Sequence, residues 1–406
     1  MKIITKYFFC FIILACIFLQ AEAGAYVWTQ KASYPGNGLA FGTGVNVKSK
    51  LYYGTGETLG SVYSEWWEYN PATNTWARQS DFPGTKRLRA CSFAISPYAF
   101  VGSGQDDLSA TNTFSDFWRY DVTSDSWLQI AGMPSARTGA SAFSYIDEGF
   151  VVNGDGTNGK ELWKYDPVNN AWSALKNFPA NGVEQSSVFA ENGKAWVCCG
   201  SDGSGGTSNL WQYNIGPNTW TQKSSFPGNA RWNAAAFMLD GKGTVGLGLS
   251  NGKLYNDVYQ YDRFLNSWSQ VDSFPGMARI GTTAFAEGDY GYICGGRDNG
   301  QYFNDLWSFG PPIDTGLIDS VPEFCSIDLT PNATKGKLYL DCDNVINKKL
   351  EFNLYDLKGR IVYSQSFNMQ TKFLELNISK YREGIYIYVI NCNDLFVTSG
   401  KLAIIQ

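Results

Sequence analysis

The feature that most constrains the fold of this chain is a tryptophan that recurs about every 48 residues. The six tryptophans, at intervals of 48, 51, 45, 48 and 48 residues, are Trp28, Trp76, Trp127, Trp172, Trp220 and Trp268. After each comes a proline, an apolar stretch, a glycine-rich step such as Gly54-Thr55-Gly56, a variable loop, and an aromatic stretch such as Trp67-Glu68-Tyr69. The chain is therefore expected to repeat one structural unit.

The repeat unit is typical of a β-propeller blade. Aromatic residues make up 16% of the chain and glycine occurs 43 times, a combination that suits short strands joined by tight turns. A period of 40 to 50 residues with this pattern predicts blades of four strands. We label the strands a to d from the propeller axis outward: a is the apolar stretch, b ends in the glycines, c carries Trp-x-Tyr, and d carries the periodic tryptophan.

Counting these strands predicts how the ring closes. Six a-b-c units begin near residues 38, 86, 137, 182, 230 and 278. The first d strand, at Trp28, precedes every a strand, and the last unit, ending near Phe309, has no d strand after it. Pairing the N-terminal strand with the last unit would leave no exposed sheet edge. We therefore expect an all-β chain in which residues 24–309 form a six-bladed propeller closed by the N-terminal strand.

The doubled glycines, the spaced aromatics and the late tryptophan resemble the kelch family across about residues 26–309. Some kelch propellers are copper oxidases of sugar alcohols, and that chemistry uses imidazole ligands. This chain has no histidine, which disfavours such an activity. We assign no cofactor, no metal site and no catalytic residue from the sequence.

The N-terminus carries the pattern of an export signal over residues 1–23. Lys2 and Lys6 precede an apolar run at residues 7–19, and Ala21-Glu22-Ala23 offers a small-x-small cleavage site. The run is shorter than the roughly 20 residues that span a bilayer, and no later segment is apolar enough to do so. A lipoprotein signal ending at Cys16 is a weaker alternative, because Leu14 fits that motif poorly.

The periodicity stops after Phe309. Residues 310–325 are predicted to be a linker rich in proline, glycine and polar residues, and residues 326–406 show short alternating strands that suggest a small β-sandwich.

Four segments resemble the C-terminal sorting domain of type IX secretion cargo: Leu329-Thr330-Pro331-Asn332, Tyr355-Asp356-Leu357-Lys358-Gly359-Arg360, Gly384-Ile385-Tyr386 and Ser399-Gly400-Lys401-Leu402. Ala333 departs from the family pattern, where a second proline is common. The resemblance implies recognition by the secretion machinery, passage through the outer membrane, cleavage of the module, and release or attachment at the cell surface. A generic β-sandwich is the alternative.

Strand alternation places the d-to-a loops and the variable b-to-c loops on one face of the propeller. The residues expected there, at the mouth of the central channel, are Arg87 or Arg89, Arg137, Glu184, Arg231, Trp232 and Arg279. Guanidinium groups bind carboxylates in bidentate fashion, and a tryptophan stacks on sugar rings. The structural alternative is that an arginine at the start of strand a bonds loop carbonyl groups.

These features predict a secreted or cell-surface binding protein that recognises a glycan or a protein through one propeller face. The net charge of −5 argues against nucleic acid as a partner. A metal-free sugar mutarotase or epimerase is an alternative, with Glu184 as its acid and base. A structural or adhesive surface protein is another.

Overall fold

The computed structural model describes residues 26–109, 112–154, 159–312 and 326–404, the last range with gaps at 331–332, 335–336, 344–348, 357–359, 372 and 393–394. The chain divides into two compact units, Met1–Pro312 and Ile313–Gln406. All regular elements in the described ranges are strands, and none of those residues forms an apolar helix long enough to cross a membrane. The export signal predicted at residues 1–23 and most of the predicted linker lie outside the described residues.

The first unit contains six four-stranded antiparallel sheets, and in all but the last the four strands follow one another along the chain. The first three sheets consist of β2 (Thr43–Val47), β3 (Lys50–Gly54), β6 (Trp66–Asn70) and β7 (Thr75–Gln79); of β8 (Cys91–Ile95), β9 (Tyr98–Gly102), β10 (Phe117–Asp121) and β11 (Ser126–Ile130); and of β12 (Ser141–Tyr145), β13 (Glu148–Val152), β14 (Leu162–Asp166) and β15 (Ala171–Ala174).

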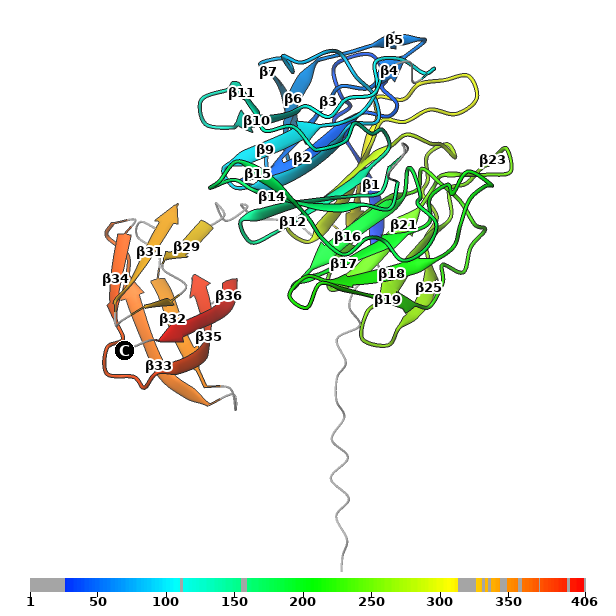
Figure 1. The fold of residues 1–406 in the computed structure, drawn as a ribbon. Helices are drawn as coiled ribbons and strands as arrows, with labels where there is room; N and C mark the ends of the chain where they lie inside the picture. Colours follow the sequence, from blue (N-terminus) through cyan, green and yellow to red (C-terminus); the bar gives the residue numbers. More distant parts are fainter. Residues whose placement is uncertain are drawn as a thin grey trace, which may run out of the picture. The chain divides into compact units, whose positions relative to one another are not determined.

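The next three sheets consist of β16 (Ser187–Glu191), β17 (Lys194–Cys198), β18 (Leu210–Asn214) and β19 (Thr219–Lys223); of β20 (Ala235–Leu239), β21 (Lys242–Gly246), β24 (Val258–Asp262) and β25 (Ser267–Val271); and of β26 (Thr283–Glu287), β27 (Tyr290–Cys294), β28 (Leu306–Gly310) and β1 (Val27–Lys31). Two short hairpins, β4 (Glu57–Thr58) with β5 (Ser61–Val62) and β22 (Leu249–Ser250) with β23 (Lys253–Leu254), extend from the first and fifth sheets. The sheets follow one another around the first unit in Figure 1, from blue through green to yellow.

The sixth sheet joins the two ends of the first unit. Its outer strand β1 pairs antiparallel with β28, and Trp28 lies opposite Phe309. The indole N–H of Trp28 donates to the carbonyl oxygen of Asp272 over 3.1 Å, and its ring packs on Phe274. The first strands of the sheets contact one another in chain order, and β26 contacts β2 again.

Six backbone hydrogen bonds of 2.7–3.0 Å link each sheet to the next, and the sixth returns to the first sheet. In each, a glycine N–H at the end of strand b donates to a carbonyl oxygen: Gly56 to Arg87, Gly104 to Arg137, Gly154 to Val183, Gly200 to Arg231, Gly248 to Arg279, and Gly296 to Leu39. These glycines have φ values of 90–104°, which favour glycine. At Gly104, a Cβ atom would lie only 2.7 Å from the carbonyl oxygen of Leu88.

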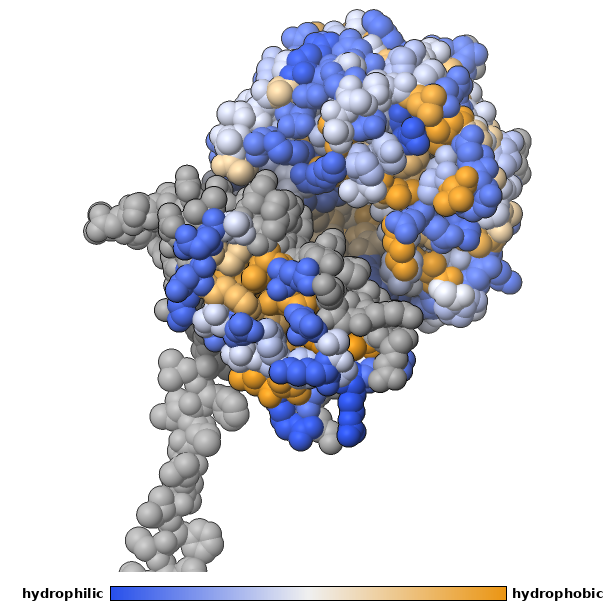
Figure 2. All heavy atoms as spheres, turned by 90° about the vertical axis from the view of Figure 1, so that its left-hand side faces the viewer, coloured by the Kyte–Doolittle hydropathy of each residue, from blue (hydrophilic) through white to orange (hydrophobic). Residues whose placement is uncertain are grey.

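The periodic aromatic residues hold neighbouring sheets together. The hydroxyl of Tyr69 donates to Asn74 Oδ1, which also accepts the backbone N–H of Ala32, and the indole N–H of Trp76 donates to the carbonyl oxygen of Ala32. The same arrangement recurs at Tyr165, Asn170 and Trp172. On the face of the first unit visible in Figure 2, hydrophobic residues are interspersed with hydrophilic ones.

The second unit contains two sheets. They are formed by β29 (Ser326–Thr330), β31 (Lys337–Asp343) and β34 (Phe373–Asn377), and by β30 (Ala333–Thr334), β36 (Leu395–Ile404), β35 (Gly384–Cys392), β32 (Lys349–Tyr355) and β33 (Ile361–Asn368). One buried cluster joins Leu338 and Leu376 of the smaller sheet to Phe352 and Ile390 of the larger. Two sheets that share one apolar core form a β-sandwich.

Candidate functional site

A cavity of about 150 Å³, which we name the mouth cavity, lies where the six sheets of the first unit converge. Each sheet contributes two consecutive residues from the loop before its first strand: Phe41-Gly42, Arg89-Ala90, Gly139-Ala140, Gln185-Ser186, Asn233-Ala234 and Gly281-Thr282. The first residue of each pair has a positive φ between 52° and 66°. The six loops therefore reach the cavity with the same backbone conformation.

A ring of five backbone hydrogen bonds, open between the loops of Asn233 and Gly281 in the described part of the chain, holds these loops in place. Arg89 N–H donates to Phe41, Gly139 to Arg89, Gln185 to Gly139, Asn233 to Gln185, and Phe41 to Gly281, at 2.7–3.1 Å. The main chain alone makes these bonds, so the frame of the cavity does not depend on which side chains it carries.

The ring of Phe41 contacts two guanidinium groups. The central carbon of Arg89 is 4.9 Å from the ring centre, and that of Arg297, which follows β27, is 5.6 Å away. Both distances are in the range of a cation–π contact. Arg89, which lines the mouth cavity, attracts an anion, and its planar guanidinium group favours a carboxylate.

Three side chains that line the mouth cavity carry polar atoms with no partner in the described part of the chain. They are Asn233 Nδ2, Gln185 Oε1 and Thr282 Oγ1, and all three atoms are buried. A buried polar atom without a hydrogen bond costs about 1–3 kcal/mol. A ligand with hydroxyl or amide groups, or ordered water, would remove this cost.

Beside Arg297 lies a fully buried carboxylate, Glu57. The hydroxyl of Tyr302 is 2.9 Å from both carboxylate oxygens of Glu57, and Arg297 Nε is 3.7 Å from Oε1. Burial, and then the hydrogen bond and charge of Glu57, raise the pKa of Tyr302. The hydroxyl therefore stays protonated and donates to the carboxylate. A carboxylate and a tyrosine hydroxyl are among the groups that serve in general acid–base catalysis.

The arginines at the start of the repeats are used differently from the sequence prediction. Arg87, Arg137, Arg231 and Arg279 are buried, and none of them lines the mouth cavity. Each forms an ion pair of 2.5–2.8 Å with a carboxylate before strand c of its own sheet: Asp116, Glu161, Asp257 and Asp305 respectively. Each also donates to a carbonyl oxygen at the end of strand b: that of Ser103, Asn153, Leu247 or Gly295. We call this arrangement the arginine lock.

The lock arginines are packed against aromatic rings, and Arg87 lowers the pKa of its partner. The guanidinium of Arg87 stacks on Phe82 and Phe114, and that of Arg279 on Phe274 and Phe303. Burial raises the pKa of Asp116, but the hydrogen bonds and charge of Arg87 outweigh it, so that pKa lies below its usual value. Arg231 and Arg279 donate from Nε, Nη1 and Nη2 to groups of the protein, as the structural alternative expected. Arg137 donates from Nη1 and Nη2, and its Nε has no partner among the described residues.

The other predicted residues lie at or near the mouth. Of the predicted arginines, Arg89 alone lines the cavity. Glu184 and Trp232 are half-buried neighbours of Gln185 and Asn233, and they form isolated bridges to Ser201 and Leu249. Glu184 also accepts a hydrogen bond from Gln185 Nε2.

Sequence reasoning missed Phe41, Glu57, Arg297 and Tyr302. A signal for two of them exists in the repeat. Glu57 and Arg297 each follow directly after the glycine-rich step, and each forms an isolated bridge with the residue just before the positive-φ position of its own sheet, Ala40 or Ile280.

Comparison with known proteins identifies the second unit. Residues 329–405 match the family model described as Secretion system C-terminal sorting domain. The chain carries a type IX sorting domain. This agrees with the resemblance drawn from its four short segments, and it implies export by the secretion machinery.

The first unit is similar to known propellers. A solved structure titled "Structure of YjhT" superimposes with a TM-score of 0.60 at 18% identity, covering 68% of this chain and 96% of that one. Curated relatives are N-acetylneuraminate epimerases, from Yersinia enterocolitica at 26% identity over 206 residues and from Shigella flexneri at 33% over 200 residues. Each match covers 39% of this chain and 52% or 53% of the relative, so the chain spans about half the length of the curated relatives it matches. The first unit is a kelch-type β-propeller.

Proposed function

We propose that this protein is an exported propeller that binds a carboxylated sugar at the mouth cavity and presents that site at the cell surface. The observation that carries the proposal is the contact of Phe41, which lines the mouth cavity, with the guanidinium groups of Arg89 and Arg297. The guanidinium groups would hold the carboxylate, and the Phe41 ring would pack against the apolar face of the sugar.

The remaining lining of the cavity fits the same ligand class. The unpartnered amide atoms of Asn233 and Gln185 and the hydroxyl of Thr282 suit the hydroxyl and acetamido groups of a sugar. N-acetylneuraminate, which the names of the curated relatives contain, is an acidic sugar with both kinds of group. It is the ligand we propose to test first.

The proposed site depends on a complete propeller. We infer that the six sheets are six blades of one closed ring, with β1 as the outer strand of the last blade. The pairing of β1 with β28 and the hydrogen bond from Gly296 to Leu39 support this inference. Arg297 comes from the last sheet, and Phe41 and Glu57 come from the first, so the site forms only where the two ends of the ring meet.

An epimerase acting at the same mouth is the second candidate. Interconversion of sugar anomers needs a base for the anomeric hydroxyl and an acid for the ring oxygen. Glu57 and Tyr302, joined by 2.9 Å hydrogen bonds beside Arg297, are the pair that favours it. Neither this pair nor Glu184, the acid and base suggested by the sequence, is among the residues that line the mouth cavity. Glu57 lies beside Arg297, which contacts the lining residue Phe41.

Calorimetry on the purified mature chain tests the binding proposal. N-acetylneuraminic acid is compared with its methyl ester, in which one methyl group replaces the negative charge of the carboxylate. We expect the acid to bind and the ester to bind much more weakly. Arg89→Gln and Arg297→Gln should each cost about 1–3 kcal/mol of affinity, the range for hydrogen bonds to charged groups.

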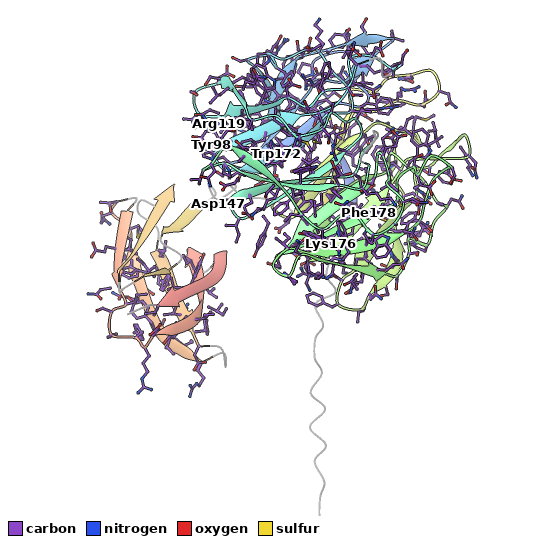
Figure 3. The ribbon with its side chains drawn as sticks, in the orientation of Figure 1. Tyr98, Arg119, Asp147, Trp172, Lys176 and Phe178 are labelled. Atoms are coloured by element: carbon purple, nitrogen blue, oxygen red, sulfur yellow. The ribbon has the colours of Figure 1, made fainter. Side chains whose placement is uncertain are left out.

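Arg119→Gln is the matched control. Arg119 also stacks on an aromatic ring, with its central carbon 4.3 Å from the centre of Tyr98, but both lie on the second sheet and neither lines the mouth cavity (Figure 3). Equal binding of acid and ester, or an equal loss in the Arg119 variant, would refute the proposal. Exchange spectroscopy of the two anomers with Glu57→Gln as control decides whether the bound sugar is also epimerised.

A further inference from the structure

The fourth sheet lacks the arginine lock, and backbone hydrogen bonds show which residues replace it. Gly154 N–H donates to Val183, just as Gly104 N–H donates to Arg137. Cys199 N–H donates to Asn209, just as Ser103 N–H donates to Asp116. Val183 therefore stands where other sheets carry the arginine, and Asn209 where they carry the carboxylate.

A cavity of about 190 Å³, the fourth-sheet cavity, lies at this position. Its wall includes Phe178, Val183, Cys199, Asp202, Thr207 and Asn209. The volume is well above the roughly 10–15 Å³ that one water needs. None of the residues that line it lines the mouth cavity, so the two sites are separate.

The wall of the fourth-sheet cavity keeps the groups that hold a guanidinium in the other sheets. Phe178 corresponds to Phe82, Phe226 and Phe274, whose ring centres lie 4.7–5.0 Å from guanidinium carbons. The carbonyl oxygen of Cys199 corresponds to those that accept arginine N–H groups in four sheets. Phe178 lies in the segment that follows β15 and is labelled, with Lys176 of the same segment, in Figure 3.

Two further groups distinguish this cavity. Asp202 brings a carboxylate to its wall. The indole N–H of Trp211 is buried without a partner among the described residues, whereas the equivalent N–H groups of Trp118, Trp163 and Trp307 donate to the lock carboxylates. The Trp211 N–H is a donor and would not itself bond a guanidinium, which has only donors, but it shows that the acceptor present in the locks is missing here.

The first sheet shows that loss of the lock need not leave a cavity of this kind. There Leu39 takes the place of the arginine, and it is buried in a cluster with Tyr34, whose hydroxyl donates to Glu65 over 3.0 Å. Large side chains of the protein itself occupy that position. In the fourth sheet Val183 and Thr207 are smaller, and the space remains.

We propose that the fourth-sheet cavity binds the guanidinium group of a separate molecule. The group would stack on Phe178 and donate to the carbonyl oxygen of Cys199 and the side-chain oxygen of Asn209, with Asp202 supplying the opposite charge. The group could belong to a free arginine-like compound or to an arginine side chain of another protein. Both present the same planar cation to the cavity.

Calorimetry on the mature chain tests this with methylguanidinium chloride, at constant ionic strength and below denaturing concentrations. Methylurea, which has nearly the same shape without the charge, is the control ligand. We expect methylguanidinium to bind and methylurea not to bind. Free arginine and an internal arginine in the peptide acetyl-Gly-Arg-Gly-amide are then compared: tighter binding of the peptide indicates a protein partner, and tighter binding of free arginine indicates a small molecule.

Two variants make the test specific. Asn209→Asp restores the carboxylate and should tighten methylguanidinium binding about tenfold, the gain expected for a charged hydrogen bond. Val183→Arg combined with Asn209→Asp rebuilds the lock and should abolish binding. Arg89→Gln at the mouth should leave it unchanged, which separates this proposal from the sugar site.

Three outcomes would overturn the proposal: equal binding of methylurea, no gain in Asn209→Asp, or binding that persists in the rebuilt lock. If the double variant does not fold, as judged by circular dichroism, the comparison of Asn209→Asp with the unmodified chain decides alone.

Discussion

The backbone N–H of Gly296 donates to the carbonyl oxygen of Leu39 over 2.7 Å, and this bond connects the last sheet of the propeller to the first. Together with the pairing of β1 and β28, it fastens the two ends of the unit to each other. Residues on either side of this junction build the mouth of the proposed site. The stability of the junction is therefore a condition for function.

Removing residues 24–33 should destabilise the whole propeller, because the sixth sheet loses β1 and the packing of Trp28 on Phe274. Trp28→Ala alone should lower the free energy of unfolding by about 2 kcal/mol, less than for a fully buried tryptophan, since Trp28 is half-buried. Thermal unfolding, monitored by circular dichroism, measures the stability of the truncated chain and of the Trp28 variant. Leu128→Ala, at an exposed position, is the control. A truncated chain with the same melting temperature as the intact chain would contradict the inferred closure.

Arg279→Met should destabilise the fold by about 3–5 kcal/mol, because it leaves Asp305 without its buried counter-charge. The double variant Arg279→Met, Asp305→Asn should recover a large part of that loss, since no unpaired charge remains. Urea unfolding gives both values. The sequence alone suggests that Arg279 binds ligand; if the single variant is as stable as the parent but loses ligand affinity, ligand binding is its role and the lock assignment is wrong.

Stability should fall in acid because of the lock carboxylates. Burial raises the pKa values of Asp116 and Glu161, but their hydrogen bonds and the charges of Arg87 and Arg137 bring both below the usual 3.8 and 4.5. A depressed folded-state pKa stabilises the fold above the unfolded-state pKa, and that contribution is lost as the pH falls through the folded-state value. Urea midpoints should thus be steady above about pH 5 and decline toward about pH 3. Arg87→Met should flatten the decline; an unchanged profile in that variant would show that the arginine locks do not cause it.

Deleting residues 326–406 should leave a folded propeller that no longer reaches the cell surface and accumulates in the periplasm. The two units have separate cores, so the propeller does not need the sorting domain for its packing. Cell fractionation and surface protease digestion measure the location. Residues 326–406 fused to a periplasmic reporter should carry the reporter to the surface, and normal surface delivery of the truncated chain would count against the sorting role.

The all-β architecture could be predicted from the sequence because each strand carries its own signal. In strands such as β8, alternate residues are buried, and the glycine step and the tryptophans mark where strands begin and end. The four short segments near the C-terminus likewise predicted the sorting domain. These signals are local, so a single sequence contains them.

The site was harder to predict because its residues come together only through the fold. Arg87 and Arg89 are two positions apart, yet one is buried in a lock and the other lines the mouth. Glu57 follows the second strand of the first sheet and Arg297 follows the second strand of the last sheet, so they are far apart in the sequence although their side chains meet. The carboxylates of the arginine locks, by contrast, can be recognised in the sequence. An acidic residue stands two positions before the strand-c tryptophan at Asp116, Glu161 and Asp305.

The hydrogen-bonded ring at the mouth has an evolutionary consequence. Its loops are held by main-chain atoms, and the positions occupied by Phe41, Arg89, Gly139, Gln185, Asn233 and Gly281 share one backbone conformation despite their different side chains. Single substitutions at the four non-glycine positions would change the chemistry presented to a ligand without rebuilding a loop, whereas at Gly281 a Cβ atom would lie only 2.9 Å from the backbone nitrogen of Phe41. Descendants of this propeller could therefore acquire new specificities in small steps, one repeat at a time, while the scaffold stays the same.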